Sequence, residues 1–254
     1  MLNILIAGSG GIGMRHIESL LKSNKLQEIS ILEKYESQIK KTKVFLKNKN
    51  KNKIKIKYFK NVNDLFRLNK SFFLVIVSTT ADVRSKIFIK LISNLRVKNW
   101  ILEKPIGQSL NDLKIYKKYV KLNNIWVNNH RRYQPLYIQL KKFLSKEPNN
   151  FNMKVISKNL GLCCNFSHWI DLFSWLQNTK PDKILSNNFV KWIPSKRKNF
   201  KELIGGFTLK YYNKTILEVS SNVEIRKKIL IGESSNNNFF CVDESKGSLF
   251  YKDK

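Results

Sequence analysis

The residues that most clearly point to chemistry are three glycines near the start of the chain, Gly8, Gly10 and Gly13, spaced G-x-G-x-x-G. In a strand-turn-helix unit the first glycine allows a tight turn, the second lets backbone approach a pyrophosphate, and the third lets helix pack closely on strand. The apolar run Leu2–Ala7 precedes these glycines and a helical pattern follows over residues 11–22, whose N-terminus favours a phosphate. The predicted dinucleotide site comprises Gly8, Gly10, Gly11, Ile12 and Gly13.

Glu33 is a carboxylate at the position where a dinucleotide site uses one to bind a ribose. Glu33 ends the next apolar run, 33 − 13 = 20 residues after the last glycine. A carboxylate at this distance binds a ribose 2′-hydroxyl and repels a 2′-phosphate, which favours NAD over NADP. Lys34 beside it weakens that preference, so NADP remains open. The alternative is a glycine-rich turn in another kind of α/β protein, and the coincidence of strand, turn, helix and acid favours the dinucleotide.

Two short polar segments follow later predicted strands. Ser78, Thr79 and Thr80 end the fourth, and Glu103 and Lys104 end the fifth. An open α/β sheet binds its ligand at this carboxyl edge, so these five residues are predicted to line the cofactor site. A lysine there can donate a hydrogen bond to a hydroxyl or ketone oxygen, or relay a proton if burial lowers its pKa. The alternatives are strand-end capping and ordinary loop chemistry.

A second group of polar residues is predicted to bind substrate. His168 and Asp171 are three residues apart on one predicted helix face, and a histidine there can exchange a proton near neutral pH. Arg131, Arg132 and Tyr133 lie in a polar cluster at the predicted domain junction, where either arginine can clamp a carboxylate or phosphate. The alternatives are a structural histidine and an ionic cluster between domains.

The order of predicted elements indicates an α/β fold with two domains. Strands and helices alternate through residues 1–126, which predicts a Rossmann domain with a parallel sheet covered by helices on both faces. Residues 127–254 predict an α+β domain with a mostly antiparallel open sheet. Strands are expected at 2–7, 29–32, 54–58, 72–78, 100–102, 125–128, 153–157, 189–193, 204–211, 215–221, 228–232 and 239–243. Helices are expected at 11–22, 36–47, 63–68, 83–94, 110–122, 136–144 and 166–176, with Ser109 as the N-cap of the fifth.

Composition narrows the class of protein. The 254 residues carry 48 basic and 18 acidic side chains, a net charge of 48 − 18 = +30. The lysines are spread along the chain among residues with A/T-rich codons, which favours a codon bias over specific nucleic-acid binding, although lysine-driven binding is an alternative. Three cysteines without metal-ligand spacing predict no metal site. The absence of a membrane-length apolar run or a signal-like start predicts a cytoplasmic enzyme.

In order along the chain, these motifs resemble the glucose–fructose oxidoreductase/inositol dehydrogenase (Gfo/Idh/MocA) family. The matching segments are 8–16, 77–80, 103–105, 131–135 and 167–171. The resemblance implies hydride transfer between NAD(P) and a hydroxyl or keto carbon of a sugar, amino sugar or nucleotide sugar, with a likeness to members of surface-polysaccharide pathways. Lys104 would bind the reacting oxygen, His168 would act as acid/base, and Glu103 would support the strand end. The open sheet of the second domain would bind substrate and join copies into a homo-oligomer.

Three departures from the family pattern bear on activity. The family's catalytic aspartate precedes the histidine by three or four residues, where this chain has Asn165 and Cys164. Thr80 and Arg84 stand where the family often has proline and histidine, and the second domain is short for the family. Asn165 would at most hydrogen-bond substrate. A catalytically impaired NAD(H)-binding protein, acting as a sensor or assembly partner, is therefore the alternative function.

Overall fold

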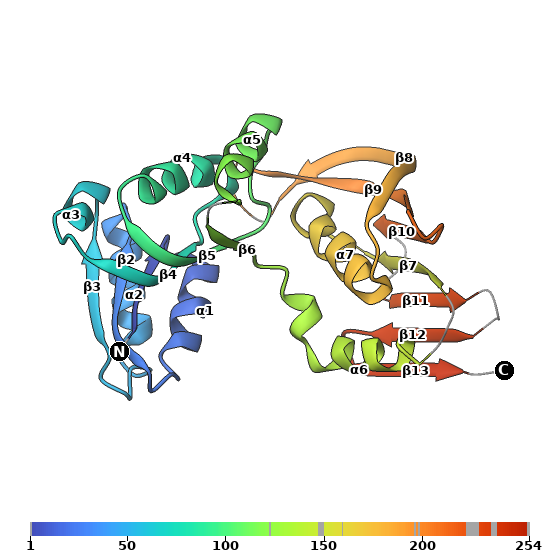
Figure 1. The fold of residues 1–254 in the computed structure, drawn as a ribbon, viewed down its shortest axis with the longest axis horizontal. Coiled ribbons are helices and arrows are strands. Elements are labelled where there is room, and N and C mark those ends of the chain that lie inside the picture. The colour runs from blue at the N-terminus through green and yellow to red at the C-terminus, as the bar shows by residue number, and fades with distance from the viewer. Residues whose placement is uncertain are drawn as a thin grey trace. The chain divides into compact units, whose positions relative to one another are not determined.

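The computed structural model describes residues 2–121, 123–146, 150–158, 160–195, 197, 199–221, 229–234 and 238–252. The chain divides into two compact units, Met1–Asn128 (the first unit) and Asn129–Lys254 (the second unit) (Figure 1). The division falls two residues after the boundary expected from the sequence, since 128 − 126 = 2.

The first unit is built on a six-stranded parallel sheet in the order β3-β2-β1-β4-β5-β6. Its strands are β1 (Leu2–Ala7), β2 (Leu26–Leu32), β3 (Lys55–Phe59), β4 (Ser71–Val77), β5 (Arg96–Leu102) and β6 (Asn124–Val127). The chain order reverses between β1 and β4, and an open α/β sheet binds its ligand at the carboxyl ends of the strands beside such a reversal. The predicted Rossmann arrangement is confirmed.

Helices cover both faces of this sheet because successive residues of its strands point to opposite sides. They are α1 (Gly11–Leu20), α2 (Glu36–Leu46), α3 (Val62–Phe66), α4 (Ala81–Ile92) and α5 (Leu110–Tyr119). Ile4 and Ile6 of β1 pack in one apolar cluster with Ile17 of α1. Leu5, between them, packs in a second cluster with Phe88 of α4. The predicted N-cap of α5 is also confirmed, since Ser109 forms a capping box with Asp112.

The second unit contains a seven-stranded sheet in the order β13-β12-β11-β7-β10-β9-β8. Its elements are the 3₁₀ turn η1 (His130–Tyr133), α6 (Pro135–Leu144), β7 (Phe151–Ser157), α7 (Leu162–Gln177), β8 (Pro181–Pro194), β9 (Lys201–Tyr211), β10 (Ile216–Ser221), β11 (Ile229–Ser234), β12 (Phe239–Asp243) and β13 (Ser248–Lys252). Among the described strand pairs of this second sheet, only β7 and β10 run parallel, so the prediction of a mostly antiparallel sheet is confirmed. Trp169 and Phe173 of α7 pack against Leu209 and Val219 of the sheet.

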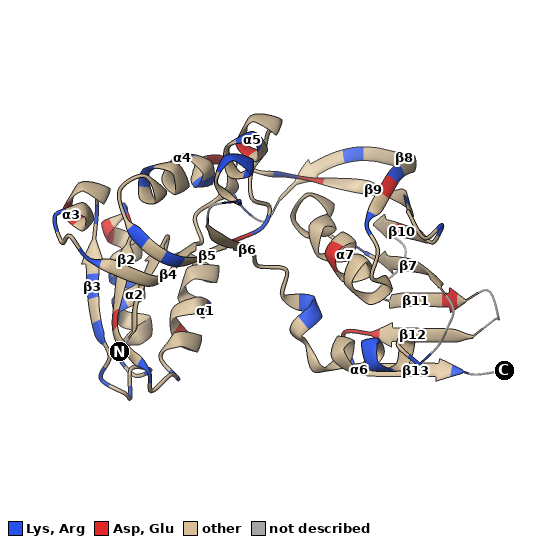
Figure 2. Ribbon diagram, in the orientation of Figure 1, with Lys and Arg blue, Asp and Glu red and all other residues tan. Residues whose placement is uncertain are grey.

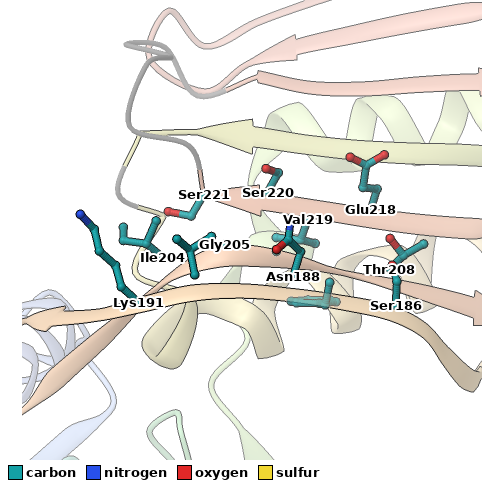
Figure 3. A pocket seen from close by; sticks show the side chains of 13 residues that line it. Ser186, Asn188, Lys191, Ile204, Gly205, Thr208, Glu218, Val219, Ser220 and Ser221 are labelled. Carbon is teal, nitrogen blue, oxygen red and sulfur yellow. The ribbon is translucent and has the colours of Figure 1, made fainter.

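The sheet of the second unit also has a hollow of about 480 Å³ over β8, β9 and β10. Hydroxyl, amide and carboxylate groups from Ser186, Asn188, Thr208 and Glu218 line it (Figure 3). None of the residues predicted to bind cofactor or substrate is among its lining residues. The sites predicted from the sequence therefore lie on other surfaces of the two units.

Three elements of the second unit differ from the sequence expectation. β8 spans Pro181–Pro194, whereas only residues 189–193 were expected, and α7 begins at Leu162 rather than at residue 166. β13 was not expected at all. Leu122 and Lys228, expected at the ends of a helix and a strand, lie outside the described residues. α7 has 16 residues, and no described helix is long and apolar enough to cross a membrane.

Candidate active site

The turn between β1 and α1 leaves no room for side chains at two of its glycines. A Cβ atom added at Gly13 would lie 2.1 Å from the carbonyl oxygen of Gly8, and one added at Gly8 would lie 2.9 Å from the backbone nitrogen of Thr79. Gly8 also has a φ of +94°, a backbone conformation that residues with a side chain rarely adopt. The two glycines thus let α1 begin directly against the ends of β1 and β4.

Gly10 lies in a different environment. Apart from its two chain neighbours, no described residue has an atom within 4 Å of a Cβ atom built on Gly10, and no side chain caps the N-terminus of α1. The space at the start of the helix is therefore open, next to the positive end of the helix dipole and to first-turn N–H groups that no side chain caps. This arrangement fits a pyrophosphate, because helix N-termini bind anions through main-chain N–H groups.

The end of β4 lies against the glycine turn. Ser78 Oγ donates to the carbonyl oxygen of Gly8 at 2.6 Å, so this hydroxyl holds the turn. Thr79 Oγ1 is buried and has no hydrogen-bond partner among the described residues. A buried hydroxyl without a partner costs free energy, and a polar group of a bound ligand would satisfy it. Thr80 is the N-cap residue of α4 and makes no side-chain capping bond.

Glu33 is buried at the end of β2 and accepts hydrogen bonds from its own chain. Its Oε2 accepts from the backbone N–H of Ser9 at 2.9 Å and from the Ser9 hydroxyl at 3.2 Å, and its Oε1 accepts from the backbone N–H of Tyr35 at 3.1 Å. A carboxylate offers about four lone-pair positions, so three are engaged. The remaining capacity suits one ribose hydroxyl, whereas Lys34 beside it is exposed.

Glu103, at the end of β5, is also buried. It accepts bonds from His16 Nε2 at 2.7 Å and from Asn128 Nδ2 at 2.5 Å. Burial raises the pKa of this carboxyl, but the bonds from His16 and Asn128 and the charges of His16 and Arg84 outweigh it, so the pKa lies below its usual value. These bonds therefore stabilise the fold above the unfolded-state pKa of Glu103 and are lost as pH falls through its lower folded-state pKa.

Lys104 follows Glu103 and is half-buried, next to a cis Lys104–Pro105 bond. The cofactor-site residues predicted from β1, β2, β4 and β5 thus lie at the carboxyl edge of one sheet. Sequence reasoning did not assign roles to His16, Arg84 or Asn128, although all three contact this edge. In the sequence, only their positions on α1, on α4 and just after β6 could have indicated that they lie near this edge.

His168 lies on α7 in the second unit and is almost fully buried. Its ring meets the ring of His130 edge-on, with centroids 4.7 Å apart. Asp171, one turn further along α7, accepts two bonds from the guanidinium of Arg132, one of them from Nε at 2.9 Å. Arg132 is thus held by a carboxylate of its own unit.

The first turn of α7 contains Asn165 and is contacted by a carboxylate that the sequence did not suggest. Asn165 Nδ2 donates to the carbonyl oxygen of Leu160 at 2.7 Å. Glu202, from β9, accepts the backbone N–H of Cys163 at 3.0 Å. An acid at a helix N-terminus is stabilised by the helix dipole. Nothing in the sequence marks Glu202, because it lies 202 − 163 = 39 residues away from its partner.

Arg131 is buried, and its guanidinium contacts other side chains of the second unit. Its Nε donates to Glu244 Oε1 at 2.7 Å, and its guanidinium lies 4.0 Å from the ring centroid of Trp169. Tyr137 donates to the same carboxylate at 2.6 Å. These contacts lie within the second unit and support a structural role for Arg131, whereas the alternative expected from the sequence was an ionic cluster between domains. Substrate contact by Arg131 and Arg132 stays a prediction. Tyr133 is exposed.

The six parallel strands, the glycine turn and the uncapped N-terminus of α1 define the class of Rossmann-fold dinucleotide-binding proteins. Residues 2–129, which are 128 of the 254 residues, match the profile of the Gfo/Idh/MocA oxidoreductase family with its NAD-binding Rossmann fold. The chain belongs to this family. It is an NAD-dependent oxidoreductase, and the carboxyl edge described above fits that cofactor.

Solved structures share the fold across both units. A dehydrogenase from Clostridium difficile has 15% identity and a TM-score of 0.68, with 100% of this chain and 83% of that chain covered. The myo-inositol dehydrogenase from Lactobacillus casei, in complex with NAD(H) and myo-inositol, has 15% identity, a TM-score of 0.71 and coverages of 96% and 74%. The UDP-N-acetylglucosamine 3-dehydrogenase from Acidithiobacillus ferrooxidans has 11% identity, a TM-score of 0.70 and coverages of 98% and 76%. No curated protein sequence matches the chain.

The contrasting surroundings of Gly10 and Gly13 predict that alanine affects mainly stability at Gly13 and mainly NAD binding at Gly10. Gly13→Ala should lower the free energy of unfolding of the first unit by about 1–3 kcal/mol, because its Cβ meets backbone. Gly10→Ala should cost less than about 1 kcal/mol of stability. It should weaken NAD binding about tenfold, because its Cβ occupies the space in front of α1. Denaturant unfolding and calorimetric titration measure the two effects, and a Gly10→Ala variant that binds NAD like the wild type would contradict this.

The two arginines of η1 predict a graded effect on the second unit. Arg131→Met leaves the Glu244 carboxylate without its guanidinium partner and should cost about 3–5 kcal/mol of unfolding free energy. Arg132→Met is the matched control, because its ion pair is more exposed, and it should cost about 1 kcal/mol or less. Urea unfolding of both variants tests this, and equal losses would show that burial does not separate the two pairs.

Proposed function

We propose that this NAD-dependent oxidoreductase transfers a hydride to or from a hydroxyl or keto carbon of a sugar, amino-sugar or nucleotide-sugar-like substrate. The observation that carries the proposal is Lys104, a half-buried amine at the carboxyl end of β5 and at the same sheet edge as the glycine turn. The solved structures of a myo-inositol dehydrogenase and a UDP-N-acetylglucosamine 3-dehydrogenase support the substrate class. A place in surface-polysaccharide biosynthesis is part of the same proposal.

Each residue in this proposal has a role set by its chemistry. The N-terminus of α1 at Gly10 binds the pyrophosphate, and Glu33 accepts one ribose hydroxyl. When bound, the cofactor would supply the redox chemistry, as hydride acceptor in the form of NAD or as hydride donor in the form of NADH. Lys104 donates a hydrogen bond to the reacting oxygen and stabilises the negative charge that develops there. His168 exchanges the proton with substrate, as a general acid or base near neutral pH.

The second candidate function is an NAD(H)-binding protein without turnover. It is favoured by Asn165, whose amide is bonded to the carbonyl oxygen of Leu160 and cannot ionise. Without a carboxylate side chain at position 164 or 165, Lys104 and His168 would work alone, and a missing acid–base partner lowers rates by about 10²–10⁴-fold. Tight NADH binding, no turnover in the wild type and new activity in Asn165→Asp would favour this function.

We further propose that the chain works in the cytoplasm and forms a homo-oligomer through the sheet of the second unit. None of its three cysteines forms a disulfide, as expected in a reducing compartment. β8 exposes large apolar side chains, including Phe189 at 50% and Trp192 at 62%, and such a surface is typical of an interface.

Turnover with NAD(H) and a panel of sugars, cyclitols and nucleotide sugars tests the catalytic roles. Lys104→Ala and His168→Ala should each lower kcat by about 10²–10⁴-fold, because each removes a group that stabilises the transition state or moves its proton. NADH binding by His168→Ala should stay within about twofold of the wild type. Unchanged turnover in either variant would make its role assignment wrong. Lys86→Ala is the matched control, because Lys86 is an exposed lysine of α4.

Cofactor preference tests the role of Glu33. Glu33→Gln keeps the size of the side chain but removes the charge that repels a 2′-phosphate. We expect its ratio of NAD to NADP affinity to fall at least about tenfold, since one charge at close range contributes roughly 1–2 kcal/mol. Calorimetric titration with both nucleotides measures the ratio. A ratio unchanged from the wild type would remove Glu33 from the cofactor site, and Glu36→Gln, at the exposed start of α2, is the control.

A further inference from the structure

Lys104 lies in a segment that side chains from other elements hold in place. The carboxylate of the preceding residue, Glu103, accepts bonds from His16 of α1 at 2.7 Å and from Asn128, just after β6, at 2.5 Å. The carbonyl oxygen of Glu103 accepts a further bond from Arg84 of α4 at 2.6 Å. Three side chains from separate parts of the first unit thus meet at the residue before the lysine.

Arg84 holds the other side of the lysine as well. Arg84 is only 3% exposed. Its guanidinium donates to the carbonyl oxygens of Pro105 and Thr79. A guanidinium carries five donors in a fixed plane and can bond several oxygens at once, which an ammonium group on a flexible stem does less well. Arg84 therefore ties the end of β4 to the end of β5, on both sides of Lys104.

These bonds are not what stability alone would select. Burying a charge costs free energy, and a well-packed apolar side chain in its place is often neutral or stabilising. Three acceptors of Arg84 are main-chain carbonyl oxygens, and they belong to the segments that follow β4 and β5, at the predicted cofactor site. The guanidinium thus fixes the path of the backbone at these strand ends. An apolar side chain in its place would define that path less well, because it forms no directional bonds to the carbonyl oxygens.

We propose that Arg84 and His16 are positioning residues, which fix the backbone of residues 103–105 so that the Lys104 amine meets the reacting oxygen. His16 lies on α1, whose N-terminus is the phosphate site, so its bond to Glu103 gives the pyrophosphate site and Lys104 a common frame. The inference rests on the proposed role of Lys104, and its test has a binding measurement that needs no substrate.

The binding measurement compares NADH with ADP-ribose, which carries the pyrophosphate and both riboses but no nicotinamide. Arg84→Met should weaken NADH binding about three- to tenfold and ADP-ribose binding less than twofold, because the strand ends are displaced while the glycine turn is not. Arg96→Met is the matched control, since Arg96 is exposed at the opposite end of β5. Affinities for both ligands that fall together, or that do not change, would overturn the proposal.

Kinetics with an accepted substrate supply the second measurement. Arg84→Met and His16→Leu should lower kcat by roughly 10- to 100-fold, the size of effect that a small misplacement of a reacting group produces. KM for NAD should rise no more than the dissociation constant for NADH does. His16→Gln retains a donor toward Glu103 and should lose less kcat than His16→Leu. Equal losses in the two His16 variants would overturn the role of the His16–Glu103 bond.

These two measurements separate the inference from the proposed function. A wild-type protein without turnover on any sugar overturns the proposed function, and the ratio of NADH to ADP-ribose affinities still decides the role of Arg84. Turnover that Arg84→Met leaves unchanged supports the proposed function and overturns the inference. Thermal unfolding of each variant shows whether it is folded at the temperature of the assay.

Discussion

The architecture of the first unit depends on one close contact, the approach of α1 to the end of β1. The space where a side chain of Gly13 would lie is already filled by the carbonyl oxygen of Gly8. This contact aims the start of the helix at the carboxyl edge of the sheet, and it also brings His16, one turn further along α1, to Glu103. The proposed phosphate site and the placement of Lys104 therefore share a single steric requirement.

Acidic residues are few in this chain, and several of them are structural. Of its 18 acidic side chains, Glu28, Glu33 and Glu103 are buried in the first unit. Glu28 binds two lysines, at 2.9 Å and 3.2 Å, whereas the other two accept hydrogen bonds at the cofactor edge. Lysine and arginine, in contrast, are spread over elements of both units (Figure 2). The excess charge is thus carried mostly by surface lysines, while the buried acids bind side chains of other elements and, in the case of Glu33, backbone N–H groups.

The sequence predicts an element or a contact well when the residues that determine it are close together in the chain. β1 and the start of α1 were predicted to the residue, because apolar run, glycines and helix period are adjacent in the chain. β8 was underestimated, since it is an exposed edge strand with prolines at both ends and two asparagines inside. Arg131 was expected to face a ligand, and its partner Glu244 lies 113 residues further on, where no local pattern announces it. Glu202 beside α7 was missed for the same reason.

The uncapped N-terminus of α1 has an evolutionary consequence. A site that binds phosphate through main-chain N–H groups needs few particular side chains around it. Substitutions next to such a helix N-terminus therefore alter binding only when they add bulk. Mutational drift can then replace most of the surface, here toward lysine and asparagine, while the nucleotide cradle survives. Solved structures that share the fold at 11–15% identity illustrate how far the sequence can diverge on this backbone.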